Sequence, residues 1–184
     1  MSEHGHISGE NKKIAILIAI LAACLAIAET GAKSAQTVVL TDQLEASDLW
    51  AFFQAKTVRQ TVVRVTADQM DATYKDAGNM PPALKTQVEA WRRTVDRFES
   101  EPETNEGRLQ LRTRARAKEA AREIASGAYH LFEYGSAAFQ LAIVLASAAA
   151  VTSVLWLAFL AGGLGIAGAG LVGLGFLAPT LIHL

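Results

Sequence analysis

The chain has 184 residues with 17 Lys and Arg against 18 Asp and Glu, and its net charge of −1 gives no global attraction to nucleic acid. Its single cysteine, Cys24, excludes an intrachain disulfide and any zinc or iron–sulfur site built from several cysteines. All Asp, Glu, Lys and Arg residues lie before residue 134. The chain therefore divides into a charged region and an apolar tail.

The first apolar segment, residues 14–28, follows a polar tail of residues 1–13 and admits three interpretations. It fits a short transmembrane helix, because the lysines that precede it can reach the headgroup region and a bilayer can thin locally. Its basic start and the small residues at 26 and 28 also fit a cleaved secretory signal. The stretch that ends at Cys24 resembles a lipoprotein signal. We favour an uncleaved first span.

Residues 29–133 are expected to form a helical extramembrane region, because no stretch alternates in polarity as a strand does. Apolar residues with coiled-coil spacing predict a helix that begins after Pro81-Pro82. They are Leu84, Val88, Trp91, Val95 and Phe98. Gly78-Asn79 are expected to close the preceding helix, and residues 101–107 to form the next turn.

Two further apolar stripes predict long helices on either side of that short helix. The first stripe comprises Leu44, Ala51, Ala55, Val58, Val62 and Val65. The second comprises Ala117, Ala121, Ile124, Ala128 and Leu131. No proline interrupts residues 14–79, so the first span is expected to continue into the extramembrane helix, with Gly31 as its only weak point. Such a stalk buries little apolar area alone, and we expect other copies to complete its core.

Residues 48–60, which read DLWAFFQAKTVRQ, resemble the signature of a bacterial membrane family catalogued as domain of unknown function 4337. A second similarity covers residues 139–147 and continues to Thr152 and Trp156. The resemblance implies a span near the N-terminus, a helical extramembrane region and two C-terminal spans. It implies no activity.

Six residues of the first long helix are expected to lie on or beside one face. They are Trp50, Phe53, Gln54, Thr57, Thr61 and Arg64. This face is either a ligand or partner surface, or a helix–helix contact with a few satisfied polar groups, and we favour the contact. An indole and an amide in a packed seam would fix its register, since each needs hydrogen bonds when buried.

Residues 134–184 carry no acidic or basic side chain except His183 and are long enough for two spans. The last span is rich in small residues, which let transmembrane helices approach closely. A packing face is predicted at Ala161, Gly165, Ala169 and Gly173. The absence of a carboxylate argues against a proton-carrying rotor subunit. The turn between the spans is expected at Thr152-Ser153, with Gly162-Gly163 as the alternative.

No nucleophile–base pair, metal-ligand set or cofactor motif has a recognisable spacing, so we expect a non-enzymatic protein with no metal and no cofactor. The leading hypothesis is a self-associating scaffold or partner-binding subunit whose contacts are membrane lipid, its own copies and other membrane proteins, but not nucleic acid. The alternative is a channel or pore-forming oligomer, and a membrane-anchored enzyme is third. Polar residues available to line a pore are Gln140, Ser147, Thr152 and Ser153.

The expected location is the bacterial inner membrane, with all three spans helical. Lys12 and Lys13 favour a cytoplasmic N-terminus under the positive-inside rule. Basic residues between 116 and 122 oppose that orientation, but long loops count less in the rule. The sequence thus predicts an all-α, three-span membrane protein with a long helical stalk.

Overall fold

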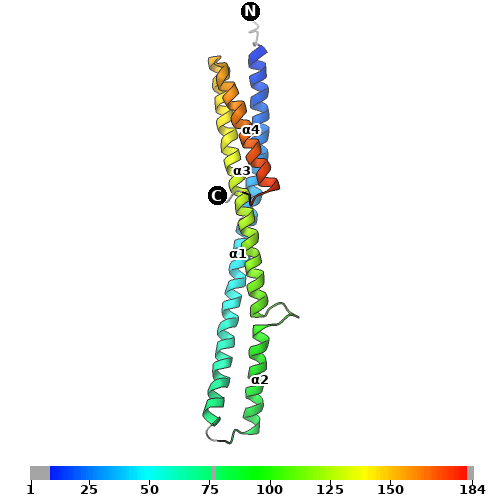
Figure 1. Ribbon diagram of the computed structural model, residues 1–184, viewed down its shortest axis with the longest axis vertical. Helices are drawn as coiled ribbons and strands as arrows, with labels where there is room; N and C mark the ends of the chain where they lie inside the picture. The colour runs from blue at the N-terminus through cyan, green and yellow to red at the C-terminus, as the bar shows by residue number, and fades with distance from the viewer. Residues whose placement is uncertain (1–8, 76–77, 182–184) are drawn as a thin grey trace, which may run out of the picture. The chain divides into compact units, whose positions relative to one another are not determined.

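The computed structural model describes residues 9–75 and 78–181, and these residues form four α-helices and no strand (Figure 1). The helices are α1 (Gly9–Lys75), α2 (Pro82–Glu99), α3 (Arg108–Thr152) and α4 (Leu155–Leu177). Helices α1, α3 and α4 are long and apolar enough to cross a membrane. The prediction of an all-α membrane protein with three spans is therefore confirmed. Most of the predicted N-terminal tail, residues 1–8, lies outside the described residues.

The helix ends follow the sequence signals. Gly78 has a left-handed φ of 62° after α1, and Pro81 precedes the first residue of α2. Asn105, with φ 57°, lies in the turn between α2 and α3. The α3–α4 turn contains Ser153, which has φ 58° and donates its backbone N–H to Ala149 at 2.9 Å. The first of the two expected turn positions is therefore correct.

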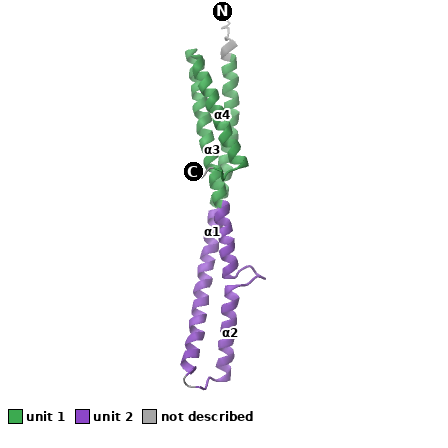
Figure 2. Ribbon diagram, in the orientation of Figure 1, with its two compact units in different colours: residues 1–40, 122–184 green, residues 41–121 purple. Residues whose placement is uncertain are grey.

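The chain forms two compact units, to each of which α1 and α3 contribute (Figure 2). Unit 1 comprises residues 1–40 and 122–184, and unit 2 comprises residues 41–121. Every apolar segment that could span a membrane lies in unit 1. Unit 2 holds most of the charged residues.

Unit 1 is a three-helix packing of small residues around a few large ones. Leu21 of α1 lies against Gly165 of α4, where a Cβ atom would stand only 2.5 Å from Leu21 Cδ2. The Phe132 ring occupies a notch between two glycines, since a Cβ at Gly31 or at Gly175 would lie 3.1 or 2.9 Å from its Cε1 atom. Gly31 was expected to be a weak point of α1, but α1 runs through it and uses its missing side chain to admit the ring.

In unit 2, α2 and the first turns of α3 both pack along one face of α1. Helix α3 does not accompany α1 to its far end, because α2 takes its place there (Figure 2). The predicted stripe on α2 faces this packing, with Val88 only 3% exposed. On α1 the packed residues alternate at spacings of four and three, as in a coiled coil. This inner seam comprises Asp42, Ala46, Leu49, Phe53, Lys56, Gln60, Val63 and Ala67.

One predicted stripe is exposed on the described chain, and a second is only partly buried. The α1 stripe, which we call the outer stripe, comprises Leu44, Ala51, Ala55, Val58, Val62 and Val65, and all six residues are exposed. In the α3 stripe, Ala117 and Ile124 are exposed, Ala121 and Ala128 are partly buried, and Leu131 is fully buried. The expectation that other copies complete the core of the stalk stays a prediction. In unit 2, charged and amide side chains occupy the buried face of α1 because they find partners there.

Candidate functional site

The turn between α2 and α3 is fastened to α1 by a buried lysine. The Lys56 side chain is 6% exposed, and its ammonium lies 3.3 Å from a carboxylate oxygen of Glu101 and 3.9 Å from one of Glu106. It also donates a hydrogen bond to the backbone carbonyl of Glu106. The rings of Phe52 and Phe98 lie 5.5 and 6.0 Å from the ammonium and cover it. Partial burial strengthens each of these contacts.

One turn further along α1, Gln60 joins all three helices of unit 2. Gln60 is 2% exposed and donates to the Val95 carbonyl and to the Glu99 carboxylate, each at 3.0 Å. Arg108 donates to the Gln60 carbonyl oxygen and to Glu99, and its Nε donates to the Thr57 hydroxyl at 2.9 Å. The Gln60 hydrogen bond, followed by the Arg108 charge, lowers the pKa of Glu99 although burial opposes the shift.

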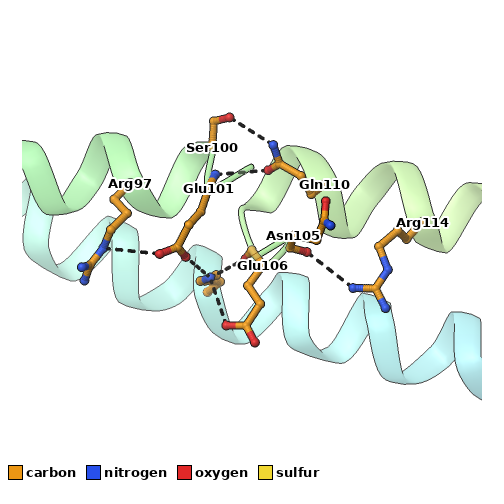
Figure 3. Close-up of polar contacts among 8 residues, drawn as sticks. Arg97, Ser100, Glu101, Asn105, Glu106, Gln110 and Arg114 are labelled. Carbon is orange, nitrogen blue, oxygen red and sulfur yellow. Dashed lines mark hydrogen bonds and ion pairs between the residues drawn. The ribbon is translucent and has the colours of Figure 1, made fainter. Parts of the chain in front are cut away.

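The turn of residues 100–107 is shaped to present its acids to α1. Gln110 accepts a hydrogen bond from the Glu101 backbone at 3.3 Å and donates one to the Ser100 hydroxyl at 3.2 Å (Figure 3). A Cβ atom at Gly107 would collide with Gln110 Oε1 and with the Glu101 backbone, so only glycine fits there. The turn is therefore held in one conformation with Glu101 and Glu106 on the same side (Figure 3). We call Lys56, Gln60, Glu99, Glu101 and Arg108 the polar clamp.

A second ionic contact ties the next part of α3 to α1. The Lys118 ammonium lies 2.9 Å from Asp42 and 2.7 Å from Glu45. Hydrogen bonds to Glu45 and then to Asp42 raise the pKa of Lys118. Lys118 thus joins α3 to two acidic residues of α1.

Of the six residues predicted to share a face of α1, three contact other parts of unit 2 and three are exposed. Trp50 donates its indole N–H to Glu119 at 2.8 Å and meets Phe53 edge to face at 5.4 Å between ring centroids. The Arg108 guanidinium lies 5.1 Å from the Phe53 ring, and Thr57 accepts from Arg108. The other three residues are exposed: Gln54, Thr61 and Arg64.

Residues 10–178 match the family model described as a domain of unknown function (DUF4337). The chain belongs to the DUF4337 family. No curated protein and no solved structure matches it. The family match spans the polar clamp and all three apolar helices, so both units are part of the DUF4337 architecture.

Sequence reasoning missed the central residues of the clamp in this DUF4337 chain. Lys56 and Gln60 both lie in the segment 48–60 that carries the family resemblance, four residues apart and thus on one helical face. Their polarity argued for exposure. The available signal was the aromatic residues beside them, since Phe52 and Phe53 on the same turn indicate a buried surface.

The small-residue face predicted for α4 is divided as well. Ala161 and Gly165 are buried within the chain, whereas Ala169 is exposed and a Cβ at Gly173 would meet nothing within 4 Å. The face of α4 that packs within unit 1 comprises Ala161, Gly165, Gly168, Val172 and Gly175.

The residues suggested for a pore do not form one cluster in the described structure. Ser147 and Thr152 donate their hydroxyls to backbone carbonyls of α3 four residues earlier, at 2.8 and 2.7 Å. Ser153 lies in the α3–α4 turn, and Gln140 lies in a groove beside α1. Within residues 9–75 and 78–181, no three His, Cys, Asp or Glu side chains are grouped so as to hold a metal ion.

Proposed function

We propose that this DUF4337 protein is a non-enzymatic membrane scaffold or partner-binding subunit that associates with copies of itself through the outer stripe of α1. The observation that carries the proposal is the exposure of that stripe. Leu44 is 66% exposed, Val58 63%, Val62 60% and Val65 55%. Apolar side chains repeated at coiled-coil spacing on a water-facing helix are typical of a contact surface.

The stripe fits a second copy because α1 also carries the first apolar segment. Copies inserted into one membrane with one topology hold α1 in the same direction, so two outer stripes meet in parallel. Ala51, Val58 and Val65 repeat every seven residues and would then face their counterparts across a two-fold axis.

A partner helix can cover the residues beside the stripe at a low cost in free energy. Thr61 and Thr66 already donate their hydroxyls to the carbonyls of Thr57 and Val62, each at 2.9 Å. A partner helix would therefore leave neither hydroxyl without a hydrogen bond. In a parallel pair, Gln54 of one helix approaches Arg59 of the other, so this rim contact brings no like charges together, and the one acidic residue at a core position of the stripe is Asp48.

The non-enzymatic character is supported by the state of the buried polar groups. Lys56, Gln60, Arg108 and Glu99 bond to one another or to the turn, and this use of their hydrogen-bonding groups is structural. We further propose a bacterial inner membrane location with a cytoplasmic N-terminus, based on the lysines at 12 and 13. Reporter fusions after Asn79 test that orientation, and cytoplasmic activity of those fusions would reverse it.

The test of self-association is a double substitution, Ala55→Glu with Val62→Glu, in the full chain. Both positions lie in the stripe seven residues apart, so two copies would bring four carboxylates together. Light scattering of the detergent-solubilised protein should give a multiple of the 19.6 kDa chain mass for the wild type and a single chain mass for the variant.

The matched control is Ala83→Glu with Ala90→Glu, which adds the same charges seven residues apart on exposed positions of α2. The control should keep the wild-type mass, and circular dichroism should show equal helix content in all three proteins. An unchanged mass of the stripe variant, or a single-chain wild type, contradicts the proposal.

A further inference from the structure

A groove in unit 1 collects polar side chains that have no partner within the described chain. It lies between α1 and α3, has a volume of about 460 Å³, and presents Glu29, Lys33, Gln36, Glu133, Ser136 and Gln140. The side chains of Glu29, Lys33, Gln36 and Gln140 form no hydrogen bond or ion pair with other described residues. Only Glu133 is engaged, by Tyr129 at 3.0 Å and His130 at 3.8 Å.

Ser136 is the observation that distinguishes this groove from an ordinary polar surface. The residue is 8% exposed, and its hydroxyl has no hydrogen-bond partner. Serine hydroxyls on helices commonly donate to the carbonyl four residues earlier, as Ser147 does at 2.8 Å. A buried hydroxyl left unpaired is destabilising, so this one is suited to a ligand that supplies the missing bond.

The groove lies where the apolar segments of two helices end. Glu29 directly follows the apolar residues 14–28 of α1, and Glu133 directly precedes the uncharged part of α3. Leu141 and Val144, next along α3, are 58% and 64% exposed, which suits acyl chains. These positions correspond to the headgroup level of a bilayer.

We propose that this groove binds the headgroup of a phospholipid with a primary ammonium, the phosphoethanolamine class. Glu29 and Glu133 supply two carboxylates against the single cation of Lys33, so the groove favours a ligand that brings a positive group. An ethanolamine ammonium donates three N–H bonds, which the carboxylates and the Ser136 hydroxyl accept. Lys33, one turn from Glu29 on α1, supplies a cation for the phosphate.

The same chemistry discriminates between lipids. The nitrogen of a choline headgroup bears three methyl groups, so it has no N–H to donate to the carboxylates. A phosphatidylglycerol headgroup brings a negative phosphate and no cation to a groove that already has one excess negative charge. Ethanolamine lipid should therefore be retained over both.

The experiment uses the full chain in nanodiscs that contain equal amounts of ethanolamine, choline and glycerol phospholipids. Native mass spectrometry then counts the lipids that stay bound to the protein after it is released from the nanodisc. The wild type should retain ethanolamine lipid at least about fivefold over choline lipid. Glu29→Gln with Glu133→Gln should abolish that preference. Glu123→Gln, an exposed glutamate of α3 outside the groove, should keep it.

Ser136→Ala separates binding from folding. Removing an unpaired buried hydroxyl should leave the thermal stability in lipid-free detergent equal or higher, while ethanolamine lipid retention falls several-fold. Equal retention of ethanolamine and choline lipids by the wild type, or an unchanged preference in the double variant, overturns the proposal. Binding of water-soluble glycerophosphoethanolamine as tight as that of the lipid would overturn the assignment to a membrane lipid.

Discussion

In both units, α1 buries residues that belong to one seven-residue repeat. These residues are apolar in unit 1 and charged in unit 2. In unit 1, Ile14, Leu21 and Ala28 are at most 6% exposed and contact other apolar residues. In unit 2 the same seven-residue repeat places Asp42 and Lys56 at 6% and 5% exposed. One helix thus carries an apolar seam in its first part and a polar seam in its second.

The difference follows from the two media. Against lipid, burial of apolar area gives no net drive, and close packing of small residues around Phe132 replaces it. In water, two narrow helices could pair in several registers, and buried charges with fixed partners exclude the wrong ones. The polar clamp and the glycine notch are therefore two solutions to the same need for specific helix pairing.

The largest effect is expected from Lys56→Met, a substitution that tests whether the polar clamp stabilises unit 2. The change keeps the length of the side chain but leaves Glu101 and the Glu106 carbonyl without their cation. Loss of one partner of a buried ion pair costs about 3 kcal/mol. We expect a clear fall in the midpoint temperature of thermal unfolding, which circular dichroism would measure.

The control for that variant is Lys85→Met, which removes the same charge from an exposed position of α2. Its midpoint should stay within the error of the wild type. If both variants unfold at the same temperature as the wild type, the clamp does not stabilise unit 2.

An intermediate effect is expected from a pair of glycine substitutions in α4. Gly175→Leu places a side chain against the Phe132 ring, whereas Gly173→Leu enters open space two residues earlier. Overpacking costs about 1–3 kcal/mol, so only Gly175→Leu should lower the unfolding midpoint in detergent. Gly173→Leu should leave the midpoint unchanged, and equal midpoints for the two variants would show that the notch is not tightly packed.

The smallest effect concerns the pH dependence of the clamp. The pKa of Glu99 is lowered from 4.5, so the ionised carboxylate stabilises the folded state at pH values above 4.5, and this contribution is lost as the pH falls through the folded-state pKa. The Glu99 side chain is 42% exposed, and solvent screening keeps the effect small. Unfolding midpoints measured from pH 7 to pH 3 should fall less in Glu99→Gln than in the wild type. Parallel curves would exclude this contribution of Glu99.

The helix boundaries could be predicted because their signals are local. Pro81-Pro82, Gly78 and Asn105 each restrict the backbone at their own position, whatever the rest of the chain does. The number of apolar helices and the family resemblance could likewise be predicted, because each depends on continuous segments of the sequence. These predictions are confirmed by the helix bounds and by the family match.

The buried faces of α1 and α4 could not be predicted, for two physical reasons. On α1, hydrophobicity favoured Val58 and Val62, but the partners that make Lys56 and Gln60 tolerable inside lie about 35 to 50 residues away in sequence. On α4, nearly every residue is small or apolar, so periodicity offers no contrast between faces. Sequence patterns rank residues by their own polarity, whereas burial depends on what each residue meets.

The continuous α1 helix also limits how its length can vary. Ile14, Leu21, Ala28, Asp42 and Lys56 are all buried, and they differ by multiples of seven residues. Within unit 2, inserting or deleting one residue between Asp42 and Lys56 would turn the following residues by about 100° around the helix axis and move Lys56 off the inner seam. A change of seven residues would keep Lys56 on the same face of α1 as Asp42. Length variants of α1 that retain the fold should therefore differ by whole heptads.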